Sequence, residues 1–173
     1  MIETKRLTIK PLSLDELRSH VAAPNEMAAE MGVTPSQSLM DEQTKDAILA
    51  DLLPFMTDPE KDPLFYTMWI VIERSQRAII GGICFHGEPN EDGEVEIGYG
   101  TDVDFRNKGY MTETIEGLLQ WLAKNEKVTT VTAESETSNI ASARVLQKNG
   151  FQIVGQKDNL IQLRLDLGQT TTH

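Results

Sequence analysis

Residues 94–113 constrain this chain most, because they join a strand, a short loop and a helix almost without a spacer. Residues 94–100 alternate between polar and apolar side chains, which is typical of a half-buried strand. A polar loop with Gly109 follows, and Met111, Ile115 and Leu118 then recur at helical spacing. Backbone N–H groups at a helix start have no intrahelical acceptor and bind phosphates readily. The segment therefore predicts an anion site where this helix begins.

Two common phosphate-binding signatures are absent from this segment. It contains neither the G-x-x-x-x-G-K-[ST] loop nor the G-x-G-x-x-G pattern after a strand. The order of elements instead favours a loop that holds a pyrophosphate-bearing cofactor of another kind.

Length and composition predict a soluble protein with one domain over residues 1–173. A chain of 173 residues is long enough to bury a sizeable core. The apolar runs are too short to span a membrane, and no signal peptide is recognisable. Cys84 is the only cysteine, so we expect neither an internal disulfide nor a metal site, and a reducing cytoplasm is the natural location.

The net charge of −11 argues against a nucleic-acid-binding surface. Seven carboxylates lie between His86 and Phe105 without any Lys or Arg: Glu88, Glu91, Asp92, Glu94, Glu96, Asp102 and Asp104. Basic residues return at Arg106, Lys108, Arg144 and Lys148. An acidic surface beside a basic patch would steer a cationic substrate toward an anionic cofactor. The alternative is an ordinary solvated hairpin.

Hydrophobic periodicity predicts an α+β fold. The expected strands cover about residues 3–11, 65–73, 78–86, 94–100, 128–133, 151–155 and 160–165. The first expected helix begins at the capping box of Ser13. Three further helices cover about residues 41–53, which Pro54 closes, 111–125 and 139–148. The breakers Pro24, Gly32 and Pro35 interrupt the segment between the first two helices. The strands at 65–100 form an antiparallel meander, and the strand at 128 lies parallel to the strand ending near Gly100.

Three segments, taken in order, resemble the GNAT superfamily of acyl-CoA-dependent N-acyltransferases, and the branch of ribosomal-protein-alanine acetyltransferases in particular. Residues 3–7 (ETKRL) are similar to the usual start of that branch. Residues 96–99 (EIGY) with 106–111 (RNKGYM) resemble the family's cofactor motif, Q/R-x-x-G-x-G/A. Residues 139–151 resemble its N-x-x-S-x-x-V-L-x-K-x-G-F segment. The resemblance covers nearly the whole chain and implies a mixed, mostly antiparallel sheet of about seven strands with a splayed parallel pair, flanked by about four helices.

The chain departs from the family pattern at two positions. Met111 replaces the usual small residue of the cofactor loop. Leu146 stands where many members carry a Tyr that is thought to protonate the departing thiolate. The usual general acid is therefore absent.

The resemblance implies acetyl-CoA as cosubstrate and a loop whose backbone N–H groups hold its pyrophosphate. The thiol arm enters between the two splayed strands, where an N–H near Ile97 or Gly98 polarises the thioester carbonyl. Asn139 contacts the cofactor arm or caps the helix it precedes. The complete set of expected cofactor-binding residues is Ile97, Gly98, Tyr99, Arg106, Asn107, Lys108, Gly109, Tyr110, Met111, Thr112, Asn139 and Ser142.

The amine must lose a proton, and the thiolate must gain one. Glu96 is the first candidate for the base, provided that its face of the strand lines the cleft. Glu134 is the second. Ser142, one turn after Asn139, is a candidate to protonate the thiolate, with Tyr99 and Tyr110 as alternatives. No serine or cysteine nucleophile clusters with a His, so we expect direct attack of the amine on acetyl-CoA without an acyl-enzyme.

The leading hypothesis is an N-acetyltransferase acting on a primary amine, such as a protein N-terminus, a polyamine, an amino acid or an antibiotic. A non-catalytic acyl-CoA-binding sensor is the alternative, and the missing Tyr favours it. An unrelated mixed-sheet domain that binds a nucleotide is a third reading. We expect no nucleic-acid or membrane partner, and a monomer or homodimer.

Overall fold

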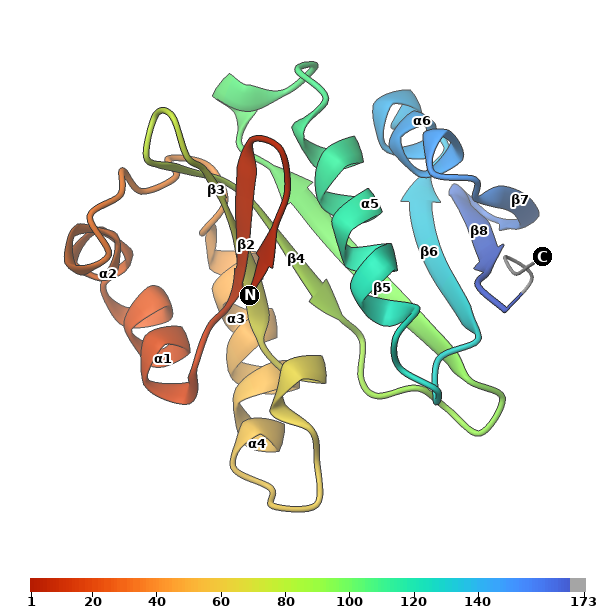
Figure 1. The fold of residues 1–173 in the computed structure, drawn as a ribbon, viewed down its shortest axis with the longest axis horizontal. Coiled ribbons are helices and arrows are strands. Elements are labelled where there is room, and N and C mark those ends of the chain that lie inside the picture. Colours follow the sequence, from red (N-terminus) through yellow and green to blue (C-terminus); the bar gives the residue numbers. More distant parts are fainter. Residues whose placement is uncertain (169–173) are drawn as a thin grey trace.

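The computed structural model describes residues 1–168, and its centre is an eight-stranded sheet (Figure 1). Across the sheet the strands follow the order β1-β2-β3-β4-β5-β6-β8-β7. Their bounds are β1 (Ile2–Glu3), β2 (Leu7–Pro11), β3 (Met68–Glu73), β4 (Ala78–Phe85), β5 (Glu94–Thr101), β6 (Thr130–Glu136), β7 (Gln152–Lys157) and β8 (Leu160–Asp166). This confirms the expected mixed, mostly antiparallel sheet.

The helices occupy the connections between these strands. The α-helices are α1 (Leu14–Ala22), α2 (Pro24–Glu30), α3 (Glu42–Ala47), α4 (Leu53–Met56), α5 (Tyr110–Leu122) and α6 (Ile140–Lys148). A π-helical turn, η1 (Ile48–Leu52), joins α3 to α4, and the 3₁₀ turns η2 (Pro63–Phe65) and η3 (Val103–Phe105) precede β3 and α5. Within residues 1–168, no helix is both long and apolar enough to cross a bilayer.

The parallel pair β5–β6 determines where a ligand can enter the sheet. Because α5 connects the two strands, they run in the same direction and pair from Glu94 with Thr130 to Ile97 with Ala133. The pairing then stops, although β5 continues to Thr101 and β6 to Glu136. The two arrows diverge at their C-terminal ends (Figure 1). This confirms the expected splayed pair.

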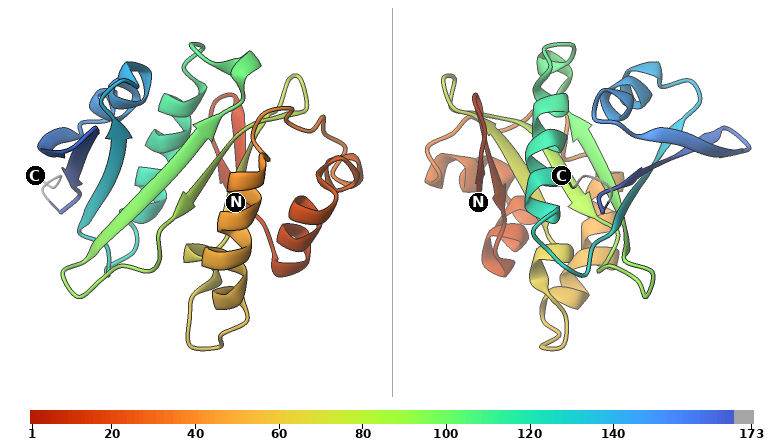
Figure 2. Two further views of the ribbon diagram at one scale, coloured as in Figure 1. Left: turned by 180° about the vertical axis from the view of Figure 1, so that it is seen from behind. Right: turned by 45° about the vertical axis from the view of Figure 1, so that its right-hand side comes forward.

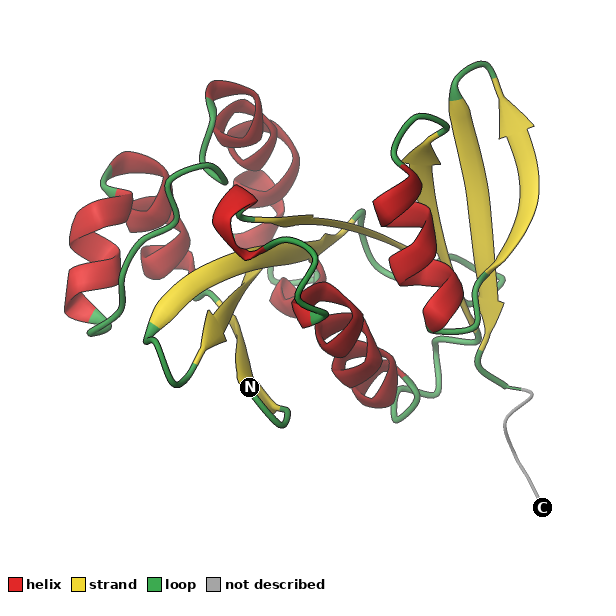
Figure 3. Cartoon of the chain, turned by 90° about the horizontal axis from the view of Figure 1, so that it is seen from above, coloured by secondary structure: helices red, strands yellow, loops and turns green. Residues whose placement is uncertain are grey.

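Two apolar cores cover opposite faces of the sheet. The ribbon shows helices lying against both faces (Figure 2). The first core packs α5 residues such as Ile115 and Leu118, together with Leu146 of α6, against the sheet. The second packs Leu17 of α1 and Ile48 of η1 against Ile70 and other sheet residues. The view from above shows helices on both sides of the strands (Figure 3). The sheet is therefore the middle layer of three.

Three expectations about local structure were wrong. The strand expected over residues 3–11 is two strands, β1 and β2, because the chain turns between them and the N–H of Thr4 donates to the carbonyl of Leu7. The breaker Pro24 starts helix α2, since a proline fits the first helical turn. Pro54 does not end the helical path, because α4 starts anew at Leu53 and places Pro54 in its first turn.

Candidate active site

A cavity of about 740 Å³, here called the loop cavity, opens where β5 and β6 diverge. Its walls come from the end of β5, the loop before α5, the first turn of α5 and the face of α6. The lining residues are Tyr99, Gly100, Thr101, Phe105, Arg106, Asn107, Gly109, Tyr110, Met111, Thr112, Asn139, Ala141, Ser142, Arg144, Val145 and Lys148. Of the twelve expected cofactor-binding residues, the cavity brings nine together and leaves out Ile97, Gly98 and Lys108.

The start of α5 is arranged to bind an anion. Asn107 and Gly109 both have positive φ angles, of 63° and 80°, which turn the loop back into the helix. No side chain caps this helix, so the N–H groups of Tyr110, Met111 and Thr112 have no intrahelical acceptor. These N–H groups and the helix dipole together favour a phosphate at this end of the loop cavity.

Basic side chains line the same cavity. Arg106, Arg144 and Lys148 belong to its walls, and the Nε of Arg106 donates to the carbonyl of Thr101 at 3.2 Å. Lys108 instead turns toward the carbonyl of Asp104 and the ring of Phe105. The charge of the loop cavity therefore suits an anionic ligand, with Arg106 rather than Lys108 inside it.

Tyr99 and Ser142 meet inside the loop cavity. The hydroxyl of Tyr99 lies 2.8 Å from the Oγ of Ser142 and 3.0 Å from its carbonyl oxygen. Burial raises the pKa of Tyr99 above its ordinary value, although its hydrogen bond to Ser142 acts in the opposite direction. Asn139 caps α6 by accepting the N–H of Ser142 at 3.1 Å, and it also lines the cavity, so its structural role is confirmed.

The two departures from the family pattern are both core residues. Leu146 is fully buried, and Met111 is 5% exposed with its terminal methyl directed toward Gly81. Leu146 belongs to the apolar core that includes Ile115 and Leu118, and is absent from the residues that line the loop cavity. The side chain of Leu146 therefore does not contact a ligand there.

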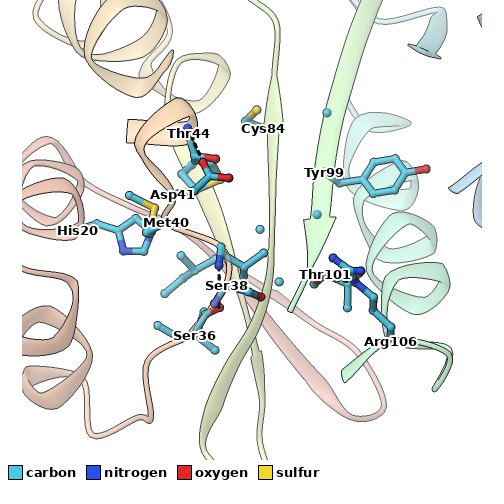
Figure 4. A pocket seen from close by; sticks show the side chains of 18 residues that line it. His20, Ser36, Ser38, Met40, Asp41, Thr44, Cys84, Tyr99, Thr101 and Arg106 are labelled. Atoms are coloured by element: carbon cyan, nitrogen blue, oxygen red, sulfur yellow. Dashed lines mark hydrogen bonds between the residues drawn. The ribbon is translucent and has the colours of Figure 1, made fainter. Parts of the chain in front are cut away.

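A second cavity, of about 270 Å³, lies on the opposite face of the sheet (Figure 4). We call it the floor cavity, because Gly82, Gly98 and Gly100 leave the strands beneath it bare. Gly82 pairs with Gly100 and Cys84 pairs with Gly98, so small residues of β4 and β5 adjoin. The other lining residues are His20, Ser36, Ser38, Leu39, Met40, Asp41, Thr44, Met68, Ile70, Ile79, Gly81, Tyr99, Thr101 and Arg106.

His20 and Asp41 give the floor cavity its polar wall, opposite Tyr99 and Arg106 (Figure 4). His20 is 7% exposed, and its Nδ1 has no hydrogen-bond partner among the described residues. Burial lowers its pKa to about 4, so His20 is neutral at physiological pH. Asp41 caps α3 by accepting the N–H of Thr44 at 2.8 Å. Neither residue carried a sequence signal for this role.

Glu96 lies on the face of β5 that carries Gly98 and Gly100, but it does not itself line the floor cavity. Its Oε2 is 2.9 Å from the Nδ1 of His86, which pairs with it from the end of β4. The sequence alone does not connect His86 with Glu96. The register of two antiparallel strands brings the two side chains together, and this register cannot be read from the sequence.

The remaining carboxylates of the acidic segment do not form one surface toward the site. In the described part of the chain, none of the seven lines the loop cavity or the floor cavity. Glu94 pairs with Arg164, Glu88 pairs with Lys61, and Asp102 caps η3. Glu134 is exposed on β6 opposite Gln162 and also lines neither cavity. The carboxylate in the floor cavity is Asp41 instead.

The two cavities share Tyr99, Gly100, Thr101 and Arg106, all at or just after the end of β5. In an antiparallel ladder, alternate residues direct their N–H groups to opposite neighbours. Gly98 pairs with Cys84 on the side of β4, so Tyr99 directs its N–H toward β6, beyond the last β5–β6 pair. Among the expected residues Ile97, Gly98 and Tyr99, Tyr99 is therefore the one whose N–H points into the space where β5 and β6 are no longer paired.

Known proteins with similar sequences and folds are acetyltransferases. The chain matches the Acetyltransferase (GNAT) domain over residues 6–152. An uncharacterized N-acetyltransferase of Bacillus subtilis, YjdG, is 27% identical over 154 residues, which are 87% of this chain and 89% of that protein.

Two solved structures share the fold. The ribosomal-protein-S5-alanine acetyltransferase of Vibrio fischeri has a TM-score of 0.67 at 16% identity and covers 98% of both chains. RimL, a ribosomal L7/L12 alpha-N-protein acetyltransferase in complex with coenzyme A, has a TM-score of 0.66 at 14% identity, with coverage of 94% and 95%. The family match covers most of the chain and agrees with the splayed sheet and the loop before α5. The chain therefore belongs to the GNAT family of acetyltransferase domains.

Proposed function

We propose that this protein transfers an acetyl group from acetyl-CoA to a primary amine by direct attack. The observation that carries the proposal is the contact between the two cavities at the end of β5. A thioester that reaches Tyr99 from the loop cavity meets an amine that enters through the floor cavity. The amine can then attack the thioester directly, without a covalent acyl-enzyme.

The loop cavity fits the chemistry of acetyl-CoA. The uncapped N–H groups at the start of α5 suit the pyrophosphate, and Arg106, Arg144 and Lys148 supply positive charge. The unpaired backbone between β5 and β6 suits the amide groups of the pantetheine arm. The N–H of Tyr99 is placed to polarise the thioester carbonyl, as an oxyanion hole does.

The proposed acceptor is a protein N-terminus or a small amine. The floor cavity is small and offers the carboxylate of Asp41 and the neutral ring of His20 as polar partners. The Vibrio fischeri protein and RimL both act, by their names, on ribosomal proteins. That shared class of acceptor supports a free α-amino group as the first substrate to test.

Two proton transfers complete the proposed reaction. For the amine proton, Glu96 is the first candidate, because it lies on the face of β5 that carries Gly98, although it does not line the floor cavity. Glu134, just beyond the last β5–β6 pair, is the second candidate. On the thiolate side, Ser142 donates a proton and Tyr99, which is bonded to it, replenishes that proton. Ser142 and Tyr99 thus take the role of the tyrosine that many family members carry at the position of Leu146.

The test is a titration with acetyl-CoA by calorimetry, followed by a thiol-release assay. Acceptors are peptides with free Ala or Ser N-termini, the same peptides with blocked N-termini, spermidine and free amino acids. We expect binding, and turnover with at least one free amine. A second function, a non-catalytic acyl-CoA sensor, is favoured by the buried Leu146. Binding without turnover on any amine would support the sensor, whereas no binding would reject both.

A further inference from the structure

His86 contacts Glu96 and lies beside Gly98, a residue that lines the floor cavity. On one face of the sheet, Cys84 of β4 lies opposite Gly98 of β5, and His86, just after β4, lies opposite Glu96. The N–H of His86 donates to the carbonyl of Glu96 at 2.9 Å, and the Nδ1 of His86 lies 2.9 Å from the Oε2 of Glu96. Both backbone and side chain therefore hold the ring in one orientation.

The other ring nitrogen lies over Gly98. A Cβ atom at position 98 would stand 2.8 Å from the Nε2 of His86 and 3.8 Å from the Sγ of Cys84. A glycine is therefore required for the ring to occupy this place. Gly98 and Cys84 both line the floor cavity, and His86 does not. Its Nε2 therefore lies next to two lining residues, on the side of the cavity proposed for the amine.

We propose that His86 is a further catalytic residue, which takes the proton of the acceptor amine on Nε2 while Glu96 orients its ring. The inference rests on the proposed function. The amine nitrogen forms a bond to the acetyl carbon, the C–S bond breaks, and the electron pair remains on sulfur. The amine proton passes to Nε2 and then to water, since the side chain of His86 is 53% exposed. A carboxylate on one imidazole nitrogen and a substrate at the other is the arrangement of a general-base dyad.

The surroundings predict how this base titrates. Hydrogen bonding to Cys84 and to Glu96 raises the pKa of His86 to about 10, against an opposing contribution from burial. The hydrogen bond from His86 in turn lowers the pKa of Glu96, which makes the carboxylate alone a weak base. The other charged groups nearby are paired elsewhere, Glu94 with Arg164 and Glu88 with Lys61. The dyad therefore holds a proton at neutral pH, and the rate rises as the pH increases.

The experiment compares the pH profiles of kcat/KM for the wild type, His86→Gln, Glu96→Gln and the control Glu94→Gln. Glu94 lies on the same face of β5 but contacts Arg164 instead. The acceptor is hydroxylamine, a small amine that is uncharged at neutral and alkaline pH. An increase of kcat/KM toward alkaline pH, here called the alkaline limb, therefore reports the titration of an enzyme group. We expect His86→Gln to lower kcat/KM about 100-fold and to remove the limb. Glu96→Gln moves the limb to lower pH, and Glu94→Gln behaves as wild type.

Loss of activity in Glu96→Gln with a normal profile in His86→Gln would overturn the proposal and leave Glu96 as the base. If the wild type acetylates no amine, the proposed function fails, and NMR titration of the His86 ring decides about the dyad separately. The pair is supported if the pKa of His86 is raised in the wild type and falls in Glu96→Gln. A His86 that titrates normally in both proteins overturns it.

Discussion

Arg6 and Glu113, which are far apart in the sequence, form an ion pair of 2.7 Å between Nε and Oε1. Burial raises the pKa of Glu113, but hydrogen bonds from Thr4 and from Arg6 outweigh this effect and hold it below its ordinary value. Arg6 also donates to the carbonyl of Lys108 and lies over the ring of Tyr110, 4.3 Å from its centre. The N-terminal segment thus fixes the loop that precedes α5.

Removing this support should weaken cofactor binding. We expect Arg6→Ala to reduce the affinity for CoA about tenfold, which corresponds to about 1.4 kcal/mol, because the loop loses its fixed orientation. The measurement is calorimetry with CoA. Lys10→Ala is the matched control, since it breaks the similar pair with Glu16 away from both cavities. An Arg6→Ala protein that binds CoA as tightly as Lys10→Ala would exclude this role for the N-terminal segment.

The left-handed conformation of Gly109 makes a second prediction about the loop. A β-branched residue at φ 80° costs about 1–3 kcal/mol and shifts the N–H groups of the loop. We expect Gly109→Val to weaken CoA binding more than tenfold while the fold remains intact. Gly32→Val is the control, because Gly32 has a similar φ of 72° and nothing within 4 Å of an added Cβ. Equal CoA affinities in the two variants would separate the loop from the site.

The contact between Tyr99 and Ser142 predicts a defect in turnover rather than in binding. We expect Ser142→Ala to lower kcat about 100-fold and Tyr99→Phe about tenfold, with an unchanged KM for acetyl-CoA, because the thiolate loses its proton source. Tyr66→Phe removes a hydroxyl outside both cavities and serves as the control. Normal kcat values in both site variants would assign thiolate protonation to water.

His20 predicts a loss of stability in mild acid. Its folded-state pKa of about 4 is below the unfolded value of 6.5, so the unfolded state binds a proton first as the pH falls. The destabilisation begins below pH 6.5 and reaches about 2 kcal/mol at pH 5. His86 acts in the opposite direction, because its pKa of about 10 keeps it protonated in the folded state, whereas the unfolded state takes up this proton only as the pH falls through 6.5. Its stabilising contribution is therefore fully present below pH 6.5 and decreases as the pH rises.

Denaturant unfolding of the wild type and His20→Leu at pH 7 and pH 5 measures this effect. From pH 7 to pH 5 we expect the free energy of unfolding to fall in the wild type and not to fall in His20→Leu, where only the opposite contribution of His86 remains. A parallel decline in both proteins would show that His20 is accessible to protons in the folded state.

Much of the fold could be predicted because its signals are local. The alternation of residues 94–100, the apolar stripe of α5 and the Asn139 cap each depend on neighbouring residues, and the structure confirms these elements. The parallel pairing of β5 with β6 followed from the helix between them. The errors at Pro24 and Pro54 arose because a proline can begin a helix as well as end one.

The acceptor side of the site could not be predicted in the same way. His20, Asp41 and His86 approach the glycine floor from α1, the start of α3 and the end of β4. Their proximity depends on strand register and on how helices pack over the sheet, which no local pattern reports. The one available signal was the number of glycines in two neighbouring strands, since β4 contains Gly82 and β5 contains Gly98 and Gly100, which indicates a surface left bare for a ligand.

A crystal structure with bound acetyl-CoA would show whether the loop before α5 holds the cofactor. We expect the diphosphate to accept hydrogen bonds from the main chain at the start of α5 and the thioester to lie beside Tyr99 between the diverging strands. Electron density for the cofactor elsewhere, with β5 and β6 paired beyond Ile97 and Ala133, would contradict this expectation.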